Sequence, residues 1–117
     1  SMDEVGGILT GAADDGSVEI EGFLTATHTV SSQESITFTR STWRDIRRSV
    51  DDEGLVGWYH SHMGNGVFLS VQDVRLHKNF FKKQHQIALV VDPVRDECAF
   101  FGWKNRRLES CEGFFII

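Results

Sequence analysis

The most constraining feature of this sequence is a strand-like run that ends in a pair of histidines and is followed by a glycine-containing loop and a helix start. Residues 55–62 are apolar and aromatic, which predicts a buried strand. Gly64 and Gly66 mark the loop, and Ser70 stands where a helix N-cap is expected, ahead of a helix at residues 71–83. A strand, a loop and a helix in this order predict a chain that packs helices on a sheet.

Further elements are predicted on both sides of this unit. β-Branched or apolar runs between turn signals predict strands at residues 5–9, 17–30, 36–39, 86–91, 97–104 and 111–117. The turn signal Asp14-Asp15-Gly16 joins the first two of these strands into a hairpin. A second helix is predicted at residues 41–50, with Ser41 or Thr42 as its cap. Its apolar residues on one face are Trp43, Ile46 and Val50. The order of elements indicates a single sheet of the α/β or α+β class.

Length and composition fit one globular domain spanning residues 1–117, with 40% hydrophobic residues. The net charge of −5 argues against a nucleic-acid partner. No apolar run is long enough for a signal peptide or a bilayer span, so we expect a cytoplasmic protein without a membrane partner. Cys98 and Cys111 form no Cys-x-x-Cys pair and are interpreted as reduced thiols. Ser1-Met2 is interpreted as a cloning remnant followed by a start.

The two histidines and an aspartate have the spacing of metal ligands. Strand side chains alternate, so His60 and His62 point to one face near the end of their strand. Asp73, in the first turn of the next helix, can add a carboxylate oxygen. Two imidazoles and one carboxylate leave a fourth position open, as in catalytic zinc sites. Ser70 is a candidate donor to an oxyanion, and Glu4 is a candidate general base that does not bind the metal.

Each part of this set also has a structural interpretation. An isolated His-x-His is usually a pair of surface or capping histidines, and Ser70 with Asp73 makes a good helix start. The combination favours the metal site, and a rigidly held cap is also a good place for a catalytic hydroxyl. The other histidines have no ligand partners at suitable spacing and are interpreted as surface or packing residues: His28, His77 and His85.

These residues resemble a known family. His60-Ser61-His62, Ser70-Val71-Gln72-Asp73 and the upstream Glu4-Val5-Gly6-Gly7-Ile8-Leu9 resemble the JAMM (MPN-plus) zinc metalloprotease family. The flanking segments are similar too: Val56-Gly57-Trp58-Tyr59, Val90-Val91-Asp92-Pro93 and Phe101-Gly102-Trp103. The resemblance covers nearly the whole chain. It departs from the family at Met63, where proline is usual, and in the absence of the helix that normally precedes the glutamate; we expect activity to survive the methionine.

The resemblance implies an MPN-type (cytidine-deaminase-like) fold, a curved mixed β-sheet flanked by helices. It implies cleavage after the C-terminal glycine of ubiquitin or a ubiquitin-like protein. Carried over, His60, His62 and Asp73 would bind one Zn²⁺ per chain. Glu4 would be the general acid/base, and Ser70 would stabilise the oxyanion.

The implied partners are a ubiquitin-like protein or its conjugates, together with E1-like or E2-like components. We expect a substrate tail to lie along an exposed sheet edge near Phe68. Two alternatives stay open. One is a peptidase that matures a sulfur-carrier or ubiquitin-like precursor, and the other is a non-catalytic scaffold with a vestigial metal site.

Overall fold

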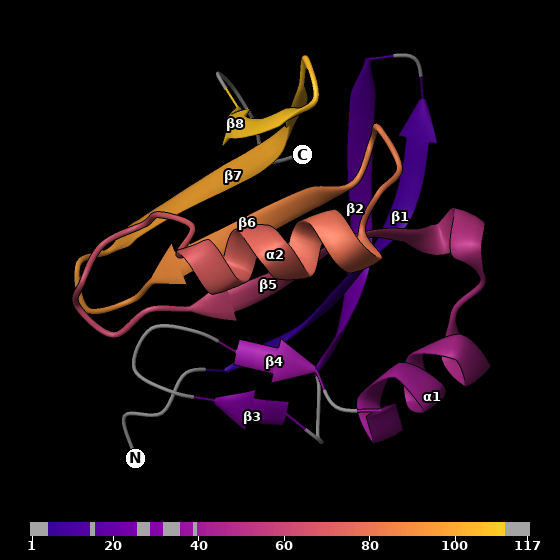
Figure 1. The fold of residues 1–117 in the computed structure, drawn as a ribbon, viewed down its shortest axis with the longest axis horizontal. Helices are drawn as coiled ribbons and strands as arrows, with labels where there is room; N and C mark the ends of the chain where they lie inside the picture. The colour runs from indigo at the N-terminus through magenta and orange to yellow at the C-terminus, as the bar shows by residue number, and fades with distance from the viewer. Residues whose placement is uncertain (1–4, 15, 26–28, 32–35, 39, 112–117) are drawn as a thin grey trace.

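The computed structural model describes residues 5–14, 16–25, 29–31, 36–38 and 40–111 (Figure 1). Its elements in chain order are β1 (Gly6–Asp14), β2 (Ser17–Thr25), β3 (Thr29–Ser31), β4 (Ile36–Phe38), α1 (Arg40–Ser49), the 3₁₀ helix η1 (Asp52–Gly54), β5 (Leu55–Ser61), α2 (Val71–Phe80), β6 (Ile87–Asp92), β7 (Glu97–Lys104) and β8 (Arg107–Ser110). Within the described part of the chain, neither α-helix is long and apolar enough to span a membrane.

Six strands form one mixed sheet in the order β2-β1-β5-β6-β7-β8. Only β5 and β6 run parallel, and the other neighbouring pairs are antiparallel. A parallel pair needs a crossover connection, and α2 supplies it. In Figure 1, α2 crosses the sheet in front of β5 and β6. The start of α2 therefore lies close to the C-terminal end of β5 (Figure 1). The mixed α/β class predicted from the order of elements is confirmed.

Both helices pack on the same core. Trp58 of β5 is completely buried and joins Ile46 of α1 and Leu76 of α2 in one cluster. Phe81, directly after α2, is also fully buried and its ring lies 6.2 Å from that of Trp58. Burying one such side chain contributes about 1.5–3 kcal/mol. The core therefore fixes α2 against β5. The histidine pair lies where β5 ends, close to where α2 begins.

Several boundaries differ from the sequence prediction, beginning with β1, which runs to Asp14 instead of ending at residue 9. The single strand predicted at residues 17–30 is wrong, because β2 belongs to the large sheet and β3 pairs with β4 in a separate ladder. The predicted cap at Ser41 or Thr42 is also wrong, since α1 already includes Arg40. Propensity indicates that a segment can form a strand or a helix, but not which partner it finds or where its first turn closes.

The helix α2 ends at Phe80, three residues before the predicted end. The side chain of Gln86 bonds a backbone N–H group that a longer helix would use: the Lys83 N–H donates to Gln86 Oε1 across 3.0 Å. The Gln86 N–H donates in turn to the Lys83 carbonyl across 2.9 Å. These two bonds close a turn in place of another helical turn.

The last strand begins earlier than predicted, directly after the turn. Asn105 and Arg106 both have positive φ (53° and 67°), as in the two-residue turns that match the twist of a hairpin. β8 therefore lies at Arg107–Ser110, and of the strand predicted at residues 111–117 all but Cys111 falls outside the described residues. Cys98 and Cys111 are free and exposed, which confirms unpaired thiols but places them at the surface.

Candidate metal centre

The two histidines lie side by side at the end of β5. His60 belongs to the strand and His62 follows it by one residue, and both side chains are completely buried. The His62 N–H donates to the Val91 carbonyl across 2.7 Å, so the ladder with β6 continues past the formal end of the strand. Because side chains alternate along extended backbone, both imidazoles lie on the face that α2 covers.

A capping box holds Asp73 at the start of α2. The Asp73 N–H donates to Ser70 Oγ across 3.1 Å, and the Ser70 N–H donates to Asp73 Oδ2 across 2.9 Å. The predicted N-cap role of Ser70 is confirmed. These reciprocal bonds satisfy two backbone donors that a helix start otherwise leaves unpaired, and they fix the buried Asp73 carboxylate.

Three side chains converge at this point. Nε2 of His60 lies 3.1 Å from Nε2 of His62 and 3.2 Å from Oδ2 of Asp73, and one ligand atom from each residue lies within 4.8 Å of the others. Ligand atoms bound at about 2.0–2.1 Å to a tetrahedral ion are separated by about 3.3 Å. The two short distances therefore match the edges of a zinc coordination tetrahedron.

An unpaired polar atom gives an independent test of this fit. Among the described residues, Oδ1 of the buried Asp73 carboxylate has no hydrogen-bond partner. A buried, unsatisfied carboxylate oxygen is costly unless a cation or a donor compensates it. The donor set of two imidazoles and one carboxylate suits Zn²⁺, so the residues present fit a catalytic zinc ion.

Neighbouring groups hold both imidazole rings in place. The Trp58 indole is stacked on the His60 ring, with centroids 4.9 Å apart and planes 10° from parallel. Nδ1–H of His62 donates to the Gly66 carbonyl across 2.6 Å. This bond assigns the proton to Nδ1, so Nε2 carries a lone pair. This is the arrangement typical of a histidine that binds a metal through Nε2.

Two buried titratable groups near the site, His77 and Asp92, have no functional role assigned from the sequence. Burial lowers the pKa of His77 to about 4, and the nearby backbone of Gln86 only partly opposes this. Burial alone would raise the pKa of Asp92, but hydrogen bonds from four backbone amides outweigh it and lower this pKa. In the sequence, Asp92 stands out only as part of the segment Val90-Val91-Asp92-Pro93 that resembles the family, and the linear spacing contains no signal that connects it to the loop after His62.

The structure places the other predicted residues as follows. Ser70 Oγ accepts one hydrogen bond from the backbone, so its own O–H proton is left for another acceptor. Phe68 is 39% exposed and its ring centroid lies 4.7 Å from that of His62, at the edge of the metal centre. His77 is buried in the core, which agrees with its interpretation as a packing residue, whereas His28 lies outside the described residues.

Glu4 lies outside the described residues, but its neighbour does not. Val5 N–H donates to Ser61 Oγ, and Ser61 N–H donates to the Val5 carbonyl, both across 2.8 Å. One residue further on, Gly6 of β1 is paired with His60 of β5. The described chain therefore begins beside the residue that separates the two histidines.

Comparison with known proteins assigns the family. The model of the family described as JAB1/Mov34/MPN/PAD-1 ubiquitin protease matches residues 1–86. The chain is 36% identical over 96 residues to "NAD(+) hydrolase TcpA" of a Theionarchaea archaeon, covering 77% of this chain and 27% of that protein. It is 41% identical over 51 residues to "Ubiquitin carboxyl-terminal hydrolase RPN11" of Saccharomyces cerevisiae, covering 43% of this chain and 17% of that protein.

A third relative is "COP9 signalosome complex subunit 5" of Debaryomyces hansenii, 47% identical over 49 residues, which is 39% of this chain and 10% of that protein. The matches thus span about a quarter or less of the length of these relatives. With most of its length matched by the family model, the chain belongs to the JAB1/Mov34/MPN/PAD-1 ubiquitin protease family.

Proposed function

We propose that this chain is a zinc-dependent peptidase or isopeptidase that cuts after the C-terminal glycine of ubiquitin or a ubiquitin-like protein. The observation that carries the proposal is the convergence of His60, His62 and Asp73, with ligand atoms 3.1 and 3.2 Å apart in a buried site. Membership of the ubiquitin protease family supports the substrate class. The relatives named as a ubiquitin carboxyl-terminal hydrolase and a COP9 signalosome subunit support a ubiquitin-like pathway or complex partner.

The ligands would hold one Zn²⁺, which supplies a Lewis acid for the scissile carbonyl and lowers the pKa of the attacking water. His62 can bind through Nε2 because Gly66 accepts its Nδ1 proton. Asp73 is oriented by the backbone of Ser70, so its carboxylate needs no rearrangement to act as a ligand.

The remaining chemistry is proton transfer and charge stabilisation. Glu4 would accept the proton of the attacking water and deliver it to the leaving amine. Its proposed role is supported by the hydrogen bonds between Val5 and Ser61, next to both histidines. Ser70 would donate its O–H to the oxyanion that forms as the carbonyl is attacked. Phe68, exposed beside His62, would contact the substrate tail.

The test compares the wild type with Glu4→Gln and with Glu53→Gln, a matched control at an exposed position in η1. Each protein is incubated with a panel of ubiquitin-like proteins that carry either a C-terminal peptide extension or an isopeptide-linked lysine, and cleavage is measured by intact mass. We expect wild type and Glu53→Gln to cut after the terminal glycine, and Glu4→Gln to be inactive while still containing zinc by elemental analysis.

The outcomes separate the alternatives. Cleavage of extensions but not of conjugates would indicate precursor maturation, including that of sulfur-carrier proteins. Full activity of Glu4→Gln would show that the general base is another group. A wild type that contains no zinc and cleaves no substrate would favour the scaffold role and overturn the proposal.

A further inference from the structure

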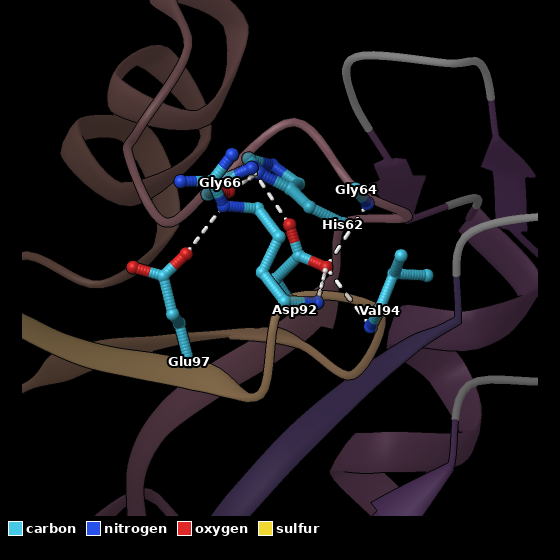
Figure 2. A network of polar contacts seen from close by, with 7 residues as sticks. His62, Gly64, Gly66, Asp92, Val94 and Glu97 are labelled. Carbon is cyan, nitrogen blue, oxygen red and sulfur yellow. Dashed lines mark hydrogen bonds and ion pairs between the residues drawn. The ribbon is translucent and has the colours of Figure 1, made fainter.

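Asp92 is a buried carboxylate that the proposed mechanism does not use. It is the last residue of β6 and its side chain is completely buried. No lysine or arginine ion pair involving Asp92 is found among the described residues; its contacts are backbone N–H groups. Figure 2 shows the carboxylate between the turn that follows β6 and the loop that follows His62.

The two oxygens of Asp92 have different partners. Oδ1 accepts from the N–H groups of Gly64, Val94 and Arg95 at 2.9, 3.1 and 3.2 Å. Oδ2 accepts from the Gly66 N–H at 2.7 Å, the shortest of the four bonds. An aspartate that only closed its own turn would need Val94 and Arg95 alone. The two bonds to Gly64 and Gly66 cross to a segment 26 to 28 residues away in sequence.

The loop has a shape that suits this arrangement. Gly64 and Gly66 have φ of +102° and +93°, a region that residues with a side chain rarely adopt. With this backbone, both N–H groups face Asp92. The Gly66 carbonyl points toward His62 and accepts a hydrogen bond from its Nδ1–H at 2.6 Å. Gly66 is thus bonded at its N–H by Asp92 and at its carbonyl by His62.

We propose that Asp92 is a positioning residue for the metal ligand His62, acting through the two peptide groups of Gly66. By holding the loop, it keeps the Gly66 carbonyl within reach of Nδ1, which fixes the His62 proton on Nδ1 and directs Nε2 toward His60 and Asp73. The inference rests on the proposed function insofar as the site binds zinc.

The test uses Asp92→Asn, which is nearly isosteric but has only one acceptor oxygen. Three of the four N–H donors face Oδ1, so the asparagine oxygen is expected on that side, with its amide group toward the Gly66 N–H. The turn keeps its bonds, and the contact with Gly66 is lost. Glu97→Gln is the matched control, because Glu97 pairs with Arg95 in the same turn but lies exposed and does not bond the loop (Figure 2).

Two measurements separate positioning from general stability. The first is the Kd for Co²⁺, with the visible spectrum of the bound ion; Asp92→Asn is expected to raise this Kd about 10- to 100-fold, as for other groups that orient metal ligands. The second is ¹⁵N NMR of the His62 ring in metal-free protein. Wild type and Glu97→Gln are expected to show the proton on Nδ1, and Asp92→Asn to show a mixture of tautomers. An unchanged Kd and tautomer in folded Asp92→Asn would overturn the proposal.

If Asp92→Asn does not fold, Gly66→Ala replaces it. No atom lies within 4 Å of the added methyl, and Asp92 keeps Val94 and Arg95, but the positive φ of residue 66 becomes strained. The same increase in Kd and loss of the single tautomer are expected, and their absence would again overturn the proposal. Because the tautomer is measured without metal or substrate, it reports on Asp92 even in a wild type that fails to cleave ubiquitin-like proteins.

Discussion

Trp58 donates its indole N–H to Nδ1 of His77 across 3.0 Å in the core, and the same indole is stacked on the ring of His60. One side chain thus connects the last turn of α2 to a proposed metal ligand on β5. Since Nδ1 of His77 accepts this bond, it must carry a lone pair, and His77 is neutral in the native state. The low pKa of His77, caused chiefly by burial, agrees with this assignment.

The first prediction is that His77 makes the protein less stable in mild acid. Its pKa is about 4 in the native state and 6.5 when unperturbed, so the unfolded chain binds the proton first as the pH falls. The contribution of neutral His77 to the free energy of unfolding is complete above pH 6.5 and is lost as the pH falls from 6.5 to about 4. The total loss is about 3 kcal/mol, and no further change from His77 is expected at lower pH. Urea unfolding at several pH values measures it.

The control for this prediction is His77→Gln, whose amide oxygen can still accept the Trp58 N–H but does not titrate. The free energy of unfolding of this variant is expected to change less between pH 6.5 and 4 than that of the wild type. Equal slopes in the two proteins would show that other groups produce the pH dependence.

The second prediction concerns the metal ligands. His60→Ala and Asp73→Ala should each reduce bound zinc from about one ion per chain to near none, because two remaining ligands hold the ion poorly. Gln72→Ala, at an exposed position next to Asp73, is the matched control and should keep its zinc. Elemental analysis of the purified proteins measures the zinc content per chain. An Asp73→Ala protein that still contains about one zinc ion per chain would show that Asp73 is not a ligand.

Local signals in the sequence predicted much of this site. The alternation of side chains placed His60 and His62 on one face, and the Ser-x-x-Asp spacing predicted the cap that orients Asp73. Both rules act over a few residues, and both describe what the structure contains. They hold because the backbone itself determines which side chains share a face or a helix turn.

The supporting contacts were not predictable in this way. Asp92 reaches Gly66 across 26 residues, and Trp58 reaches His77 across 19. These pairs depend on β5 lying parallel to β6 and on how α2 packs on the face of the sheet (Figure 1), which no short motif specifies. The strand predicted at residues 17–30 was wrong for the same reason, because strand propensity does not select a partner strand.

The third prediction separates the two roles of Ser70. Ser70→Ala should lower kcat by roughly 10- to 1,000-fold through loss of the oxyanion donor. It should also reduce the free energy of unfolding by about 1 kcal/mol, because the N-cap acceptor for the Asp73 N–H is lost.

Ser70→Gly provides the comparison. Glycine also lacks the hydroxyl but costs only a few tenths of a kcal/mol as a cap. The two variants should therefore lose similar activity and differ in urea midpoint. Wild-type kcat in Ser70→Gly would show that the hydroxyl does not act on the substrate.

The fourth prediction concerns the close approach of the strands that carry the site. Gly57 of β5 is paired with Ile87 of β6, and a methyl group on Gly57 would collide with the Ile87 carbonyl oxygen. Gly57→Ala should therefore destabilise the protein by about 3 kcal/mol, since backbone cannot yield as a flexible side chain does. Gly102 of β7 is paired with Ile87 from the other side, but its added methyl would meet its nearest atom at 3.4 Å. Gly102→Ala should thus cost much less, and similar urea midpoints for the two variants would show that the β5–β6 spacing relaxes to admit a side chain.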